Sequence, residues 1–215
     1  MNPATKFKIM QEHQLGIVPP QYKGKEIRSE ASQNANFEEE AKALFAIAKK
    51  RLLDVNNWNN IAGAVTARFQ VIDENGREVS GPVKQNDHVR ISIPAPGSKE
   101  GDGYDWVHVE ELKEINESSF QSVGFRVRPA GNPFSNKNET AHFYSEDATS
   151  SFIVTRNGTK ITSLIIDRNL QPNTDSSSLV DKVRDVMVGV SAIAGFSKIQ
   201  WQGLADGLLD FDDNN

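Results

Sequence analysis

The chain has 215 residues, which is long enough for one substantial hydrophobic core. Hydrophobic residues make up 37% and charged residues 25%, values that exclude a disordered chain, and no apolar stretch reaches the roughly 20 residues of a membrane-spanning helix. The net charge of −5 argues against a general nucleic-acid binder. The lack of cysteine excludes disulfides and cysteine-ligated metal centres.

Little regular structure is predicted for the N-terminal region. The first ten residues carry Lys6 and Lys8 but no apolar run behind them, so we predict no secretory signal and a cytoplasmic protein. Residues 1–24 contain several prolines and are expected to form a weakly structured segment, followed by a short strand at about 25–31.

A helix is predicted from residue 36 to residue 55. Asn36 followed three residues later by Glu39 fits the capping-box pattern at its start. Apolar residues then recur at helical spacing, namely Phe37, Ala41, Leu44, Phe45, Ala48, Leu52 and Val55. This amphipathic helix is expected to pack its apolar face on another element.

The hydrophobic period then changes from 3.6 to 2, which is typical of half-buried strands. Apolar and polar residues alternate in the segments 65–71, 89–93, 107–110 and 123–128. Asn157-Gly158 between two β-rich runs predicts a tight hairpin. Because the strands follow one another without helices between them, an antiparallel sheet is favoured over a parallel one.

A long helix is predicted over residues 177–209. Its apolar face carries Leu179, Val183, Val186, Val190 and Ile193, and Met187 widens it. Gly195 either bends this helix or permits a close contact. We therefore predict an α+β fold, a single domain over 25–209 and an acidic tail at 210–215. A curved antiparallel sheet of about six or seven strands would pack against a long C-terminal helix and an N-terminal helix.

The sequence contains no phosphate-binding loop, nucleophile elbow or His-Glu-x-x-His motif. His108 and Glu110 share a strand face, and with His142 they would form a metal site or an acid–base pair if their strands were adjacent. The alternative is a solvated strand face, which we favour, so we predict no catalytic residue, no metal and no cofactor.

Four arginines fall on the polar phase of their strands, namely Arg68, Arg90, Arg126 and Arg128. Two interpretations are open: the arginines bind an anion or an acidic partner, or they are ordinary charges on a solvent-exposed face of the sheet. The aromatic residues would either line the mouth of an apolar pocket or complete a core.

The order of elements, with the segment Leu53-Asp54-Val55-Asn56-Asn57-Trp58 closing the first helix, resembles the helix-grip order of the START-like (SRPBCC) superfamily. That resemblance implies a hydrophobic ligand cavity between sheet and helix, and it carries over no catalytic residue. The chain departs from the pattern in its poor first strand, its single N-terminal helix and its long loops at 94–104 and 129–140. The segments 126–129 and 141–144 are also similar to a group of uncharacterised bacterial proteins, which implies no function.

We first predict a non-enzymatic binding domain for an apolar or amphipathic small ligand, with Trp106 and Tyr144 at the cavity mouth. The predicted ligand-binding residues are Trp106, His108, Arg126, His142, Tyr144 and Met187. Two alternatives stay open. One is an interaction protein or homodimer that uses the arginine face or residues 201–209, and the other is a cyclase or lyase that uses His108, Glu110 and His142.

Overall fold

A computed structural model describes residues 15–63, 67–93, 101–135, 139–173 and 186–211. Within the last range, the side chains are described from Ser197 onward. In these ranges no helix is long and apolar enough to cross a membrane.

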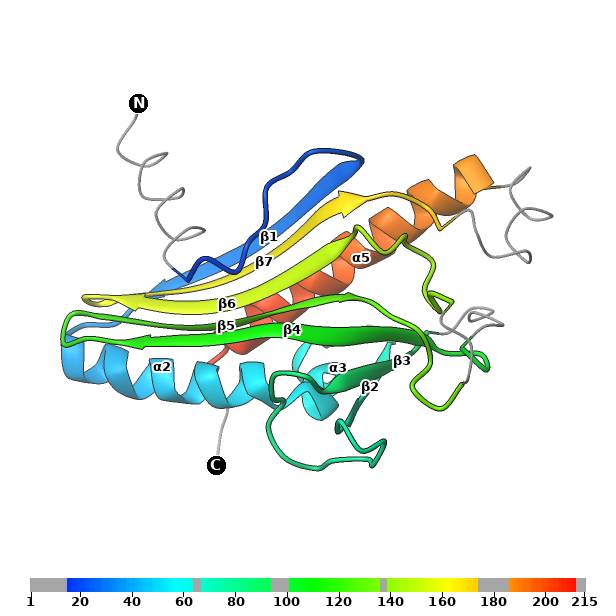
Figure 1. Ribbon diagram of the computed structural model, residues 1–215. Coiled ribbons are helices and arrows are strands. Elements are labelled where there is room, and N and C mark those ends of the chain that lie inside the picture. The colour runs from blue at the N-terminus through cyan, green and yellow to red at the C-terminus, as the bar shows by residue number, and fades with distance from the viewer. Residues whose placement is uncertain (1–14, 64–66, 94–100, 136–138, 174–185, 212–215) are drawn as a thin grey trace.

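The strands form one antiparallel sheet of seven, in the spatial order β1-β7-β6-β5-β4-β3-β2 (Figure 1). Their bounds are β1 (Lys25–Asn34), β2 (Arg68–Ile72), β3 (His88–Ser92), β4 (Asp105–Asn116), β5 (Phe120–Pro129), β6 (Thr149–Asn157) and β7 (Lys160–Leu170). The pairing of β1 with β7 is the connection that breaks sequential order. The predicted α+β fold with a curved antiparallel sheet is confirmed.

The predicted hairpin joins β6 and β7, and its two loop residues are Gly158 and Thr159, which lie between the paired residues Asn157 and Lys160. Gly158 adopts a φ of +58°, a left-handed conformation that glycine reaches without steric cost. The turn keeps both long strands in register, and it thereby fixes which residues of β7 face the helices.

The helices are α2 (Glu38–Leu53), the 3-10 turn η1 (Val55–Asn57), α3 (Trp58–Ile61) and α5 (Val186–Leu208). The helix predicted over residues 36–55 is confirmed from Glu38 to Leu53, and it ends earlier than expected because the chain leaves helical geometry at Asp54, with φ −87° and ψ 66°. The predicted capping box is wrong. Phe37 is the N-cap, and the Asn36 backbone N–H and side-chain amide donate to Glu40 Oε2 at 2.7 and 3.0 Å.

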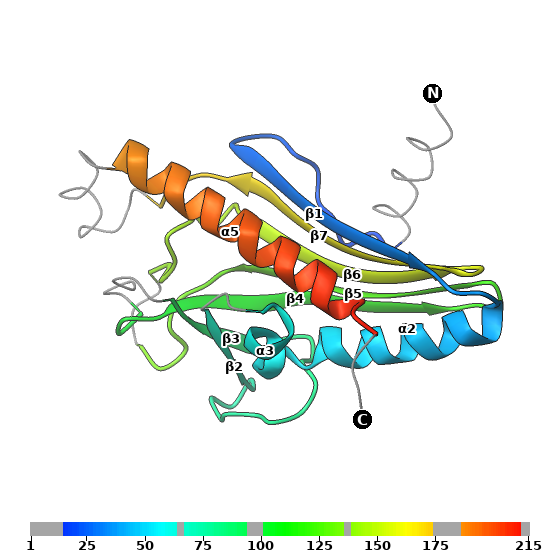
Figure 2. The same cartoon turned by 180° about the vertical axis from the view of Figure 1, so that it is seen from behind.

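Three helices cover the concave face of the sheet, with α5 lying across β1 and β7 (Figure 2). One core cluster joins Phe45 of α2, Leu204 of α5 and Phe125 of β5. The predicted C-terminal helix is confirmed from Val186 to Leu208, whereas its predicted start at residues 177–185, with Val183, lies outside the described residues.

A short segment that precedes β1 covers part of the convex face of the sheet. Leu15, Ile17 and Val18 carry no regular structure, yet they are buried against Ile153, Leu164 and Ile166. Ile166 therefore lies on the side of the sheet opposite the C-terminal helix. Because β6 and β7 are buried on both faces, the alternation of polar and apolar residues could not reveal this.

An apolar cavity between the sheet and α5

A cavity of about 370 Å³ lies between the concave face of the sheet and the helices. Among the described residues, seven large aromatic side chains line it, namely Trp58, Phe69, Phe125, Phe143, Tyr144, Phe152 and Trp201. Aliphatic side chains complete the apolar wall: Val55, Ala67, Val89, Ile91, Ile93, Val107 and Val127. The apolar lining follows from the strand period, since alternate residues of β2, β3, β4 and β5 point to this face.

Trp58, the first residue of α3, is fixed by its surroundings. Its indole Nε1 donates to the Arg51 and Leu52 carbonyls at 3.3 and 3.2 Å. Its ring packs against Phe152 and Phe125, with centroids 4.7 and 5.9 Å apart. The break of the helix at Asp54 is therefore what turns a bulky aromatic residue toward the sheet.

Asn56 attaches this turn to β2. Its side-chain oxygen accepts a hydrogen bond from the Val71 backbone N–H at 2.7 Å, and its amide donates to the Val79 carbonyl at 2.6 Å. These two hydrogen bonds hold the turn between α2 and α3 against β2, the edge strand of the sheet. The segment 53–58 that carries the superfamily resemblance forms one wall of the cavity.

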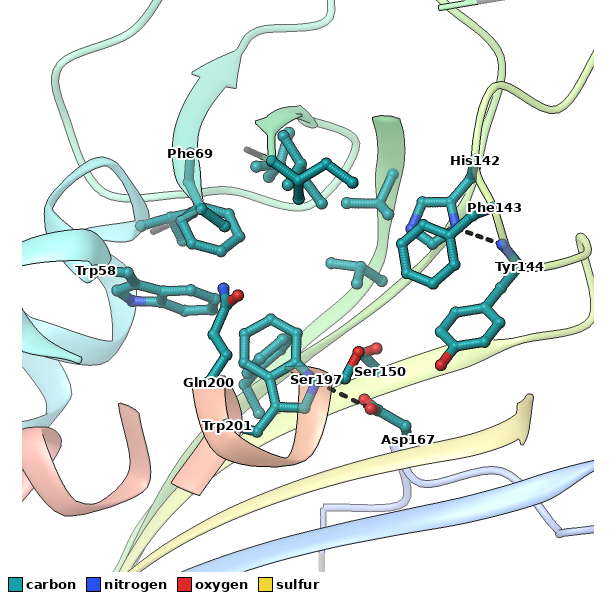
Figure 3. Close-up of a pocket in the computed structure, with 18 of the residues that line it drawn as sticks. Trp58, Phe69, His142, Phe143, Tyr144, Ser150, Asp167, Ser197, Gln200 and Trp201 are labelled. Carbon is teal, nitrogen blue, oxygen red and sulfur yellow. Dashed lines mark hydrogen bonds between the residues drawn. The ribbon is translucent and has the colours of Figure 1, made fainter. Parts of the chain in front are cut away.

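A carboxylate interrupts the apolar wall. Asp167 of β7 is 1% exposed, and its Oδ2 accepts a hydrogen bond from Trp201 Nε1 at 2.9 Å (Figure 3). Burial raises the pKa of Asp167 to about 7, while the Ser150 hydroxyl and the Trp201 indole lower it in part. Ser150 is the residue opposite Asp167 on β6.

His142 and Tyr144 enter the cavity wall from the segment between β5 and β6 (Figure 3). His142 Nδ1 accepts a hydrogen bond from the Tyr144 backbone N–H at 3.0 Å. Burial lowers the pKa of His142 to about 3, so this imidazole is neutral at pH 7. Burial and the nearby Asp167 charge raise the pKa of Tyr144 to about 12, with Ser197 opposing them.

Of the six predicted ligand-binding residues, the structure places His142 and Tyr144 in the cavity wall. Trp106 does not line the cavity. It is buried on the other face of the sheet with Ile72 and Ala141, and its indole Nε1 donates to the Gly101 carbonyl at 3.2 Å. Met187 belongs to α5, but its side chain lies outside the described residues.

His108 and Arg126 also lie away from the cavity. Along β4, His108 and Glu110 alternate with the core residues Val107 and Val109, so their side chains occupy the opposite face. The ring of His108 lies beside that of His88, with centroids 5.0 Å apart.

Three of the four arginines on the polar phase of the strands are ion-paired, and the fourth, Arg68, is exposed at the start of β2. Arg126 Nε and Arg128 Nε donate to the two oxygens of Glu110 at 2.6 and 2.5 Å, and Arg90 pairs with Glu78 at 2.8 Å. Glu110 is therefore held by two guanidinium groups and separated by the sheet from His142. In the ranges that the structure describes, no group of three histidine, aspartate or glutamate residues could hold a metal ion.

The sequence reasoning missed Asp167. In the sequence, Asp167 directly follows the apolar run Leu164-Ile165-Ile166, and β7 is buried on both faces. A carboxylate in such a position could have been recognised as a buried polar group. Ile165 belongs to the core cluster of the concave face, so the period of two places Asp167 on that same face.

No protein-family model matches the chain, and no curated protein matches it. Among solved structures, a hypothetical protein from Helicobacter pylori is 11% identical, with a TM-score of 0.48 over 86% of this chain and 88% of that one. A point mutant of norcoclaurine synthase from Thalictrum flavum is 11% identical, with a TM-score of 0.35 over 88% and 96%. A protein from Thermus thermophilus is 12% identical, with a TM-score of 0.37 over 88% and 100%. At these values the likenesses assign neither a family nor a function to the chain.

Proposed function

We propose that the protein is a non-enzymatic binding domain of the START-like helix-grip type, whose cavity takes an apolar or amphipathic small molecule. The observation that supports this proposal is the cavity of about 370 Å³ with an apolar lining between the sheet and α5. Pockets for small ligands commonly measure about 300–1,000 Å³ and combine apolar walls with a few polar groups.

The physical chemistry of the lining favours such a ligand. A molecule that buries about 200 Å² of apolar surface would gain roughly 5 kcal/mol from leaving water. Rings that are already packed against one another, such as Trp58 with Phe152 and Phe125, lose little freedom when the ligand enters.

The enzyme alternative lacks this support. It depends on His108, Glu110 and His142, of which only His142 lines the cavity, while His108 and Glu110 lie on the face of β4 that points away from it. A cytoplasmic location, the absence of a nucleic-acid partner and the domain bounds 25–209 stay predictions from the sequence.

Native mass spectrometry of the protein as purified from cells, followed by denaturing extraction, tests the proposal. We expect a small apolar molecule that accompanies the folded chain and is released on denaturation. A chain at twice the monomer mass that releases no small molecule, and that also fails to bind the neutral dye Nile red, would overturn the proposal in favour of a self-associating protein.

A further inference from the structure

Asp167 has an unusual place in the cavity wall. Its carboxylate is almost completely buried, and Oδ2 is engaged by the Trp201 indole. Among the residues that the structure describes, Oδ1 is buried and has no partner in full hydrogen-bond geometry, although the Ser150 hydroxyl lies near enough to the carboxylate to lower its pKa. Buried polar atoms are almost always hydrogen-bonded, so a buried carboxylate oxygen without a partner points to a group that the cavity is built to receive.

The described residues around Asp167 supply no positive charge. The described residues that line the cavity include no lysine or arginine, and His142 is kept neutral by burial. Ser150 of β6, Ile27 of β1, Ser197 of α5 and Tyr144 are the neighbours that the other elements present to it. An ionised carboxylate in such a site costs free energy until a cation or a strong donor reaches it.

From this arrangement we propose that the ligand is an apolar molecule with a single protonated amine, which donates a hydrogen bond to the carboxylate of Asp167. Its apolar body would lie among the rings of Trp58, Phe152 and Trp201. This inference rests on the proposed function and names the ligand class for the same cavity.

Other ligand classes match the wall less well. A carboxylic acid would bring a second negative charge beside Asp167 with no cation to balance it. A pure hydrocarbon would leave Oδ1 without a partner in full hydrogen-bond geometry, and an alcohol would supply a neutral hydrogen bond, which is about half as strong as a charge-assisted one. An ammonium group also gains from the faces of the surrounding aromatic rings.

Three probes with one naphthalene body test the inference by isothermal titration calorimetry at pH 8: 1-naphthylmethylamine, 1-naphthalenemethanol and 1-naphthoate. In the wild-type protein the amine should bind at least about 10-fold more tightly than the alcohol, and the carboxylate most weakly. In Asp167→Asn the affinity for the amine should fall to that of the alcohol, while the alcohol changes by less than about 3-fold. Asp87→Asn is the matched control, because Asp87 is a buried aspartate that does not line the cavity.

The outcomes separate the two proposals. Equal binding of amine and alcohol to the wild-type protein, or unchanged amine affinity in Asp167→Asn, would overturn the amine inference and leave the binding function standing. Failure of all three probes to bind the wild-type protein would overturn both. The comparison within the wild-type protein needs no variant, so it decides the matter even if Asp167→Asn does not fold.

Discussion

Burial raises the pKa of Asp167 and lowers the pKa of His142. These two shifts change the stability of the folded state in opposite ways as the pH changes. The pKa of Asp167 rises from 3.8 to about 7, so the folded state holds more protons than the unfolded state between these pH values. Stability from this group is fully present below pH 3.8 and is lost as the pH rises through 7. The pKa of His142 falls from 6.5 to about 3, so its contribution is present above pH 6.5 and is lost as the pH falls through 3.

Between about pH 4 and pH 6.5 these two effects oppose each other, so they largely cancel in the free energy of unfolding of the wild-type protein. We expect Asp167→Asn to unmask the aspartate. The free energy of unfolding of the variant, minus that of the wild type, should increase from about pH 4 to about pH 7 and then level off. A one-unit difference in pKa corresponds to about 1.4 kcal/mol, so the increase should be easily measured.

Urea denaturation across the pH range provides the measurement. Two other titratable groups of the cavity wall do not affect this difference between variant and wild type. Tyr144 titrates far above this pH range, and His142 is present in both proteins. A difference in free energy that does not depend on pH would show that Asp167 titrates normally, and it would remove the argument that this carboxylate is buried without a counter-charge.

At this scale, sequence reasoning identified part of the site. His142 was singled out as a residue that could take part in metal or acid–base chemistry, and Tyr144 as an aromatic residue near the end of an element; both line the cavity. Trp106 does not line the cavity because Tyr104, Phe134 and Ala141 bury it on the convex face, a contact between distant segments that no local pattern predicts. Asp167 was missed because a carboxylate on a strand normally indicates a solvated face.

At the scale of elements, β5 carries two valines on the concave face with different surroundings. Val127 lines the cavity, whereas Val123 is fully buried in the same core cluster without lining it. Val127→Phe is expected to fill the cavity and abolish Nile red binding with a small loss of stability. Val123→Phe should cost about 1–3 kcal/mol by overpacking and keep the dye affinity of the folded protein.

Dye titration and urea denaturation of both variants check this pair. Retained dye binding in Val127→Phe, with its fold intact by circular dichroism, would show that the dye binds outside the cavity and would count against the binding proposal.

The contact between α3 and α5 depends on glycines that the sequence reasoning did not single out. A Cβ at Gly207 would lie 1.9 Å from the Ile61 carbonyl oxygen, and one at Gly203 would lie 2.6 Å from that of Ala62. Around Gly195, by contrast, an added Cβ would meet nothing within 4 Å. Of the two roles considered for Gly195, the structure therefore gives no support to a close contact.

These distances predict opposite effects of one substitution at two positions of α5. Gly207→Ala should lower the free energy of unfolding by about 1–3 kcal/mol, because two backbones must separate. Gly195→Ala should raise it by up to about 1 kcal/mol, because alanine favours the helix and clashes with nothing. Thermal unfolding of both variants measures the difference, and equal stabilisation by the two would contradict the close approach of α3 and α5.

The elements themselves were largely predictable, since periods of 2 and 3.6 report on half-buried strands and on one-sided helices. The hairpin between β6 and β7 followed from the Asn157-Gly158 sequence alone, although the loop residues are Gly158 and Thr159. The break at Asp54 did not, because α3 is held by Trp58 and Asn56, whose partners lie on other elements. The side on which Ile166 lies could not be predicted either, because a strand buried on both faces carries no alternation.

At the scale of the whole molecule, the sheet separates two apolar layers. Helices and the cavity lie on its concave face, while Leu15, Ile17 and Val18 cover β6 and β7 on the convex face. The Ile17 carbonyl accepts a hydrogen bond from Arg126 Nη1 at 2.9 Å, which fixes this segment over the sheet. The segment is therefore expected to contribute to stability without contributing to the binding site.

Ile17→Ala tests this division. Ile17 is fully buried, so the substitution should lower the free energy of unfolding by about 2–5 kcal/mol through lost burial and the space it leaves. The affinity of the folded variant for Nile red, measured well below its unfolding temperature, should equal that of the wild type, because the altered side chain lies across the sheet from the cavity. Val127→Phe should show the reverse pattern, with lost affinity and nearly retained stability. If Ile17→Ala weakened dye binding as well, the two layers would be coupled through the sheet, and the convex cover would have to be counted as part of the binding machinery.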